Sequence, residues 1–235
     1  MLNPRPTIRV DSLGDGNNIV IVDDFLLEPD KMVTFARTHR AHFSNGDHNF
    51  FPGPEMLLPD EVSRAIDEFV TRHVRGPLGL RRTNIIGSRL SLATLKPEQL
   101  QNMQRICHRD IEPTGDRGGT GAMVLNLFKD PRLGGTCFFR HKRSPEDFKD
   151  MMARARSMER AAFIEFVGAG PGYAIASDKF FELVYTSTPA YNRAIFYHGT
   201  LPHSGAIRWP ELLSDDVDTG RLTVNAFFNL KRSVE

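Results

Sequence analysis

Residues 105–110 have the sequence Arg-Ile-Cys-His-Arg-Asp, and they hold the most informative spacing in the chain. If this stretch is a strand, His108 and Asp110 project from the same face, because strand side chains alternate. A neutral imidazole nitrogen beside a carboxylate oxygen suits ferrous iron, and a second histidine would complete a three-ligand site with open positions. The alternative is an ordinary solvated pair, since His-x-Asp is common by chance. The remainder of the chain has to decide between the two.

The composition is that of an ordinary soluble globular protein. Of the 235 residues, 40% are hydrophobic and 25% are charged, and this length favours one domain spanning residues 1–235. The net charge of +1 gives no basis for nucleic-acid binding or for an acidic membrane surface. No apolar run approaches a membrane span, and residues 1–16 lack the apolar core of a signal peptide. We therefore expect a cytoplasmic protein in which Cys107 and Cys137 stay reduced.

Periodicity predicts helices first and then many strands. The clearest helix spans residues 59–74, where apolar residues recur at i, i+3, i+4, i+7 and i+8. A second helical pattern covers about residues 144–166 and begins with the N-cap Ser144, and another helix should open near residues 27–30. Expected strands cover residues 18–24, 85–94, 122–128, 133–140, 180–186, 193–198 and 221–230. The third and fourth of these should form a hairpin. This order favours an α+β protein with N-terminal helices packed on one sheet of a β-sandwich or barrel.

Residues in the later part of the chain supply the remaining candidates. A third metal ligand could come from His198, at the end of a strand, or from His203, in a Pro-His-Ser-Gly turn. Arg221 and Thr223 share one face of the last strand, where a guanidinium and a hydroxyl would suit a carboxylate. The alternative is a surface arginine on an exposed edge strand. Arg140 could similarly meet an acidic substrate group, or it could be a solvated charge at the end of a strand.

The order of these features resembles the prolyl-hydroxylase-like branch of the iron- and 2-oxoglutarate-dependent oxygenases. The matching pieces are His108-Arg109-Asp110, the run from Asn126-Leu127-Phe128 to Gly134-Gly135-Thr136-Cys137-Phe138-Phe139, then His203 and Arg221. Residues 51–53, the Gly-Gly-Thr run and residues 202–205 further resemble an uncharacterised bacterial subgroup. The resemblance spans residues 18–231 and rests on the joint order of motifs that are each weak alone.

This resemblance implies a double-stranded β-helix, also called a jelly roll or cupin-like fold. It implies one ferrous iron, 2-oxoglutarate as cosubstrate and O2 as oxidant. The implied metal ligands are His108, Asp110 and His203. His203 is preferred over His198 because the separation between His203 and Arg221 is usual in the family.

The resemblance also implies cosubstrate contacts and a class of reaction. Arg221 and Thr223 would bind the distal carboxylate of 2-oxoglutarate. Asn126 is a third cosubstrate-binding candidate, at a position where the family often has a tyrosine. The implied reaction is hydroxylation of a C–H bond of a small molecule or a peptide side chain, with ascorbate as auxiliary reductant. Selectivity is expected from the loop of residues 39–54 and the helical insert of residues 144–166.

A second function remains open at this point. The chain could be a non-catalytic jelly-roll protein that binds a ligand and retains the fold, because a fold does not determine its function.

Overall fold

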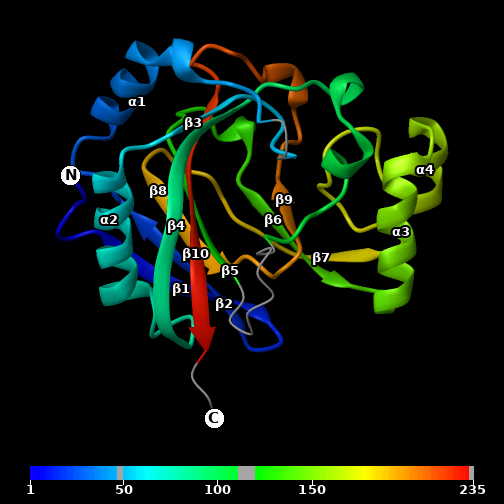
Figure 1. The fold of residues 1–235 in the computed structure, drawn as a ribbon, viewed down its shortest axis with the longest axis horizontal. Coiled ribbons are helices and arrows are strands. Elements are labelled where there is room, and N and C mark those ends of the chain that lie inside the picture. The colour runs from blue at the N-terminus through cyan, green and yellow to red at the C-terminus, as the bar shows by residue number, and fades with distance from the viewer. Residues whose placement is uncertain (47–49, 111–119, 233–235) are drawn as a thin grey trace.

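The strands of this protein form two antiparallel sheets in the computed structural model, which describes residues 1–46, 50–110 and 120–232 (Figure 1). In chain order the strands are β1 Thr7–Gly14, β2 Asn17–Asp23, β3 Glu55–Leu57, β4 Leu80–Ala93, β5 Thr120–Asn126, β6 Thr136–His141, β7 Phe181–Thr186, β8 Arg193–His198, β9 His203–Gly205 and β10 Arg221–Arg232. The large sheet has the order β1-β2-β8-β5-β10-β4-β3, and the small sheet has the order β7-β6-β9. The architecture is therefore a mixture of helices and antiparallel sheets.

Two helices cover the outer face of the large sheet. Helix α1 (Pro29–Thr38) and helix α2 (Asp60–Phe69) contribute to one apolar cluster with the sheet, and α2 continues into a π-helical turn at Val70–Val74. On β4, Leu90 and Leu92 are fully buried in this cluster. The strand predicted for residues 85–94 and the apolar stripe predicted for residues 59–74 are thus confirmed.

The inner face of the large sheet packs against the small sheet. Its apolar cluster includes Ile21 of β2, Ala122 of β5 and Phe138 of β6, so it draws on both sheets. On β10, Leu222 belongs to the outer cluster. Since side chains alternate along a strand, Arg221 on the same strand projects to the inner side.

Two further helices pack on the outer face of the small sheet (Figure 1). Helix α3 (Pro145–Ser157) begins with a capping box, in which the Asp147 N–H donates to the Ser144 hydroxyl at 3.1 Å and the Ser144 N–H donates to the Asp147 carboxylate at 3.3 Å. The single helix expected over residues 144–166 is in fact two. Helix α3 ends at Ser157, and the Glu159 carboxylate caps a new helix, α4 (Arg160–Val167).

The hairpin expected from residues 122–140 is wrong. Strand β5 lies in the large sheet and β6 in the small sheet. The Pro and Gly residues between them form a 3-10 turn at Pro131–Leu133, capped by Asp130, which carries the chain from one sheet to the other. Local turn signals indicate that the chain reverses, but they do not indicate which sheet the next strand joins.

Residues 105–110 do not form a strand either. Only His108 makes an isolated backbone bridge, to His203 at the start of β9. Strand β1 has no counterpart among the expected elements, because its sequence TIRVDSLG is largely exposed and lacks a clear apolar face.

Two simple observations bear on the cellular setting. Cys107 and Cys137 are buried free thiols in the apolar cluster beneath α3 and α4. Within residues 1–46, 50–110 and 120–232, none of the helices has both the length and the apolar character needed to cross a bilayer.

Asn192, just before β8, joins the large sheet to the N-terminal segment. It has a left-handed φ of 63°, its side-chain oxygen accepts from the Leu26 N–H at 2.9 Å, and its amide donates to the Leu26 carbonyl at 2.9 Å. Asn192→Ala would leave the backbone N–H and carbonyl of Leu26 unpaired, and alanine tolerates this φ less well than asparagine. We therefore expect the free energy of unfolding to fall by about 3 kcal/mol. Urea denaturation measures the change. Asn17→Ala in the β1–β2 turn is the control, and a loss below about 1 kcal/mol for Asn192→Ala would contradict this view.

Candidate metal and carboxylate site

Three side chains converge on the inner side of the sheets. His108 and Asp110 come from the irregular segment before β5, and His203 begins β9. One possible ligand atom from each lies within 4.8 Å of the other two. The Nε2 atom of His203 is 3.4 Å from Oδ2 of Asp110, and Nε2 of His108 is 3.7 Å from Oδ1. The predicted pair therefore meets a second histidine, although the segment that carries the pair is not a strand.

Backbone hydrogen bonds fix where these residues stand. The His108 N–H donates to the His203 carbonyl at 2.9 Å, and the His203 N–H donates to the His108 carbonyl at 2.8 Å. The Asp110 N–H donates to the Gly199 carbonyl at 2.7 Å, and the Gly199 N–H donates to the Thr120 carbonyl at 2.7 Å. The segment is thus tied to β9 of the small sheet and to β5 of the large sheet.

The donor atoms fit a divalent cation. Nδ1 of His203 lies 2.8 Å from the Leu201 carbonyl, which holds the ring proton on Nδ1 and leaves the lone pair on Nε2. Oδ2 of Asp110 is buried and has no hydrogen-bond partner in the described part of the chain. An unpaired buried carboxylate oxygen is costly, and a metal ion would satisfy it. Two imidazoles and one carboxylate do not fill an octahedral shell, so positions would stay open for other ligands.

Both imidazoles favour the neutral form that binds a metal. Desolvation lowers the pKa of His203 to about 4, against a smaller opposing effect of its bond to Leu201. The pKa of His108 is lowered in the same direction, by desolvation and then by the His203 ring, although 55% of its side chain is exposed. Desolvation raises the pKa of Asp110, and His108 acts against this.

The alternative ligand His198 points away from this cluster. Its Nε2 lies 2.9 Å from the Leu78 carbonyl, which belongs to a residue of the outer apolar cluster. Tyr197, the preceding residue on β8, belongs instead to the inner cluster. The structure therefore brings His203, and not His198, to the His108–Asp110 pair.

Arg221 lies on the inner face and is buried, and none of the described residues pairs a carboxylate with it. Its Nε donates to the Leu133 carbonyl at 3.0 Å and its Nη2 to the Gly135 carbonyl at 2.9 Å. Desolvation lowers its pKa to about 10, and Tyr173 and Tyr197 offset this in part, with no carboxylate among the described residues contributing. A guanidinium has five N–H donors, so three remain for a further acceptor.

The Gly-Gly pair at residues 134–135 allows these carbonyls to reach Arg221. A Cβ on Gly134 would lie 2.0 Å from the Ala206 carbonyl oxygen, and its φ of +82° is unfavourable for other residues. A Cβ on Gly135 would lie 2.0 Å from the Ser187 carbonyl oxygen. The run that carries the family resemblance thus has a physical reason, because any side chain would push the backbone off its neighbours.

Thr223 and Asn126 are register partners across β10 and β5, on the same face as Arg221. The Thr223 hydroxyl is fully buried and donates weakly to the Ser91 carbonyl at 3.4 Å. The Asn126 side-chain oxygen is buried and has no partner within the described ranges. Cosubstrate binding by either residue stays a prediction.

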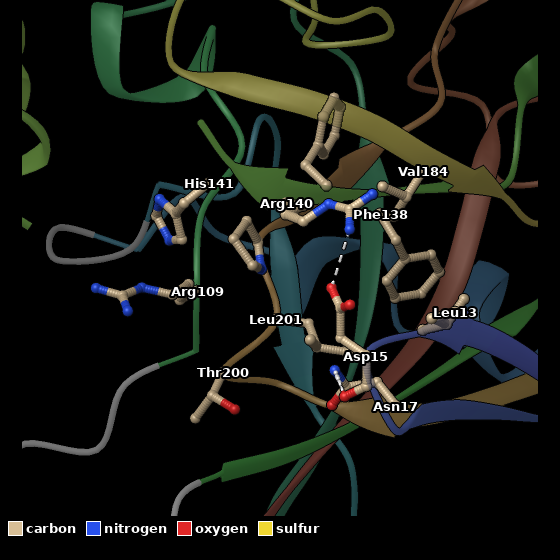
Figure 2. Close-up of a pocket in the computed structure, with 13 residues that line it drawn as sticks. Leu13, Asp15, Asn17, Arg109, Phe138, Arg140, His141, Val184, Thr200 and Leu201 are labelled. Carbon is tan, nitrogen blue, oxygen red and sulfur yellow. Dashed lines mark hydrogen bonds and ion pairs between the residues drawn. The ribbon is translucent and has the colours of Figure 1, made fainter. Parts of the chain in front are cut away.

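A pocket of about 300 Å³ opens between the β1–β2 turn and the end of β6 (Figure 2). Its wall includes Phe138, whose ring centroid lies 6.4 Å from that of His203. Arg140 pairs with Asp15 of the turn at 3.3 Å and with Glu182 of β7 at 3.2 Å. The predicted substrate role of Arg140 stays a prediction, and it would require an exchange of partners.

Two residues that no sequence motif singled out complete the site. Tyr197 is 2% exposed, and its ring meets those of Phe138 and His203 edge-on, at centroid distances of 4.8 Å and 4.9 Å. Gly199 provides the carbonyl that binds Asp110, and a Cβ there would lie 2.9 Å from the Asp110 carboxylate oxygen Oδ2. Neither carries a sequence signal, since Tyr197 belongs to an apolar strand and Gly199 resembles any turn glycine.

Several solved structures are similar to this chain. The non-heme alpha-ketoglutarate-dependent epimerase SnoN from nogalamycin biosynthesis matches with a TM-score of 0.52 and 14% identity, over 90% of this chain and 78% of that one. A Pseudomonas putida prolyl-4-hydroxylase gives 0.43 and 12%, over 92% and 93%. An N-substituted L-amino acid dioxygenase from Burkholderia ambifaria gives 0.39 and 11%, over 91% and 85%. The likeness to SnoN shows a shared fold, whereas the two lower scores carry no argument.

A family model also matches the chain. It is described as a family of unknown function, DUF6445, and it covers residues 4–228. The chain therefore belongs to this family. The comparison with curated proteins found no match.

Gly199→Ala tests the support of the carboxylate. The added methyl group would collide with Asp110 and displace its oxygen atoms, so we expect zinc to bind about 10- to 100-fold more weakly, the usual effect of disturbing the support of a ligand. Isothermal titration of the metal-free protein with Zn²⁺ measures this. Gly172→Ala is the matched control, because its Cβ would make only an ordinary contact of 3.6 Å with Pro97. Equal affinities for the two variants would contradict the assignment.

The lowered pKa of His203 predicts how the metal-free protein responds to acid. In the unfolded chain this histidine titrates near pH 6.5, whereas in the fold its pKa is about 4. Between these values the unfolded state binds more protons, so the free energy of unfolding falls as the pH drops. Between pH 7.5 and 4.5 the free energy of unfolding should fall by about 2 kcal/mol less in His203→Gln than in the wild type, as measured by urea denaturation. Identical pH profiles for the two proteins would show that the ring is not buried as described.

Proposed function

We propose that this chain is an Fe(II)- and 2-oxoglutarate-dependent oxygenase and that its two sheets form a double-stranded β-helix. The observation that carries the proposal is the meeting of His108, Asp110 and His203 within 4.8 Å, on the same inner side as Arg221. A structural zinc site is usually closed by four protein ligands, whereas three ligands leave room for a cosubstrate. The fold likeness to an alpha-ketoglutarate-dependent enzyme supports the same conclusion.

Each residue has a defined task in this proposal. His108 and His203 would hold the metal through imidazole nitrogens and Asp110 through its carboxylate. When bound, Fe(II) and 2-oxoglutarate supply an oxidative decarboxylation coupled to the reduction of O2. The Leu201 carbonyl keeps the Nδ1 proton of His203 in place and so leaves Nε2 available. Arg221 would direct its remaining N–H groups at the distal carboxylate, whose negative charge compensates the buried guanidinium.

The substrate would be a small molecule or a peptide side chain with a C–H bond to hydroxylate. The pocket beside β6 is lined by Arg109, Arg140 and His141 (Figure 2). Nε of Arg109 is buried and has no hydrogen-bond partner among the described residues. These groups favour a substrate that carries a carboxylate or another acidic group, and ascorbate would serve as auxiliary reductant.

Ligand removal tests the metal assignment. Anaerobic addition of Fe(II) and 2-oxoglutarate to the wild-type protein should give a visible charge-transfer absorbance. His108→Ala and His203→Ala should abolish it, because each removes one of three ligands. His198→Gln should retain it, since a glutamine amide can still donate to the Leu78 carbonyl. A band of undiminished strength in both alanine variants would refute the assignment.

Product analysis separates the oxygenase from the alternative function. In air, with iron and ascorbate, an oxygenase should release succinate from 2-oxoglutarate even without its substrate. A protein that binds iron and 2-oxoglutarate but yields no succinate would instead be a non-catalytic jelly-roll ligand-binding protein.

A further inference from the structure

Tyr197 differs from the other three tyrosines of the chain in having an unsatisfied hydroxyl. The hydroxyls of Tyr173, Tyr185 and Tyr191 donate to the Leu95 carbonyl, to Asp11 and to Asp30 respectively. The Tyr197 hydroxyl makes no hydrogen bond to any residue in the described part of the chain, although the side chain is 2% exposed. The hydroxyl oxygen is not one of the fully enclosed unpaired atoms, so it stays accessible to a group that the protein chain itself does not supply.

The position of Tyr197 identifies where that group would lie. Its ring packs edge-on against His203, at a centroid distance of 4.9 Å, and against Phe138 on the facing sheet, at 4.8 Å. The Asp110 carboxylate and the Arg221 guanidinium are both close enough to act electrostatically on the hydroxyl, in opposite directions. Tyr197 therefore lies beside the candidate ligand His203, on the inner side of the sheets to which Arg221 also projects.

Further polar groups on this inner side lack partners within the described ranges. Oδ2 of Asp110 and the side-chain oxygen of Asn126 are buried without partners among the described residues. Arg221 keeps three N–H donors after its bonds to backbone carbonyls. A molecule that binds Arg221 through an anionic oxygen and a metal ion through a second oxygen would span the space beside Tyr197. A 2-oxo dicarboxylate has this arrangement of groups.

We propose that Tyr197 is a cosubstrate-binding residue whose hydroxyl donates a hydrogen bond to a carboxylate of 2-oxoglutarate. The inference rests on the proposed function and extends it. In this proposal the phenol comes from β8. The neighbouring strand β5 carries Asn126 at the position where the resembling family often has a tyrosine.

Binding measurements on Tyr197→Phe test this assignment without relying on turnover. With Zn²⁺-loaded protein, isothermal titration should give a Kd for 2-oxoglutarate about tenfold higher in the variant than in the wild type, the loss of one hydrogen bond to a charged group. The Kd for Zn²⁺ should be unchanged and the melting temperature without cosubstrate should not fall, because the hydroxyl that the variant removes makes no hydrogen bond to the described residues. Tyr185→Phe is the control and should bind 2-oxoglutarate like the wild type, since its hydroxyl bonds to Asp11.

The outcomes separate this inference from the proposed function. Equal 2-oxoglutarate affinity in Tyr197→Phe and wild type overturns the role of Tyr197 while the oxygenase proposal stands. No 2-oxoglutarate binding to Zn²⁺-loaded or Fe(II)-loaded wild type overturns both. A rise in Kd for Tyr197→Phe that is matched by Tyr185→Phe also overturns the assignment.

A second measurement uses the wild-type protein alone. The chain has four tyrosines, so protein labelled with ¹³C at the phenolic carbon gives a simple spectrum. Addition of 2-oxoglutarate to the Zn²⁺-loaded wild type should shift one resonance, that of Tyr197, as its hydroxyl gains an acceptor. Binding of 2-oxoglutarate without any shift of that resonance would overturn the proposal.

Discussion

The two backbone hydrogen bonds between His108 and His203 are the interaction on which the site depends. They place the two residues directly opposite each other, so their ring centroids lie 4.3 Å apart. Asp110 is held in place because its N–H donates to the Gly199 carbonyl, and the Gly199 N–H donates in turn to a carbonyl of β5. Main-chain contacts therefore set the positions of the three residues.

The division of polar and apolar surface explains why such a site is tolerated. Both outer faces of the sheets are covered by helices and apolar clusters, which supply most of the burial that stabilises the fold. Among the described residues, the inner side instead keeps a buried guanidinium with spare N–H donors, an unpaired carboxylate oxygen of Asp110 and an unpaired amide oxygen of Asn126. An unsatisfied buried polar group costs about 1–3 kcal/mol. A bound ligand that satisfied these groups would remove that cost.

Much of this protein follows from local sequence rules, and the remainder depends on contacts between distant residues. The helix at residues 59–74, the Ser144 cap and the alternation along β4 are readable because periodicity and capping act over a few residues. The candidates at residues 108, 110 and 203 emerge from spacing and order, and the structure brings them together. The sequence does not predict that β5 and β6 join different sheets, because this depends on which sheet edge is free. The hydroxyl of Tyr197 escapes notice for the same reason, since only its neighbours in space show that it lacks a partner. Arg221 was expected to present its whole fork to a carboxylate, whereas part of the fork is used on the carbonyls near Gly134.

The arrangement of α3 and α4 has a consequence for how such proteins diversify. These helices pack into a cluster of their own on the outer face of the small sheet, while Phe138 and Tyr197 belong to a separate cluster on the inner side. The cluster beneath them also holds Ile106 and Cys107, which directly precede His108, and the Phe148 ring of α3 contacts the Arg109 guanidinium. Changes on the buried faces of α3 and α4 would therefore reach the segment that carries His108 and Asp110, whereas their exposed residues can vary freely.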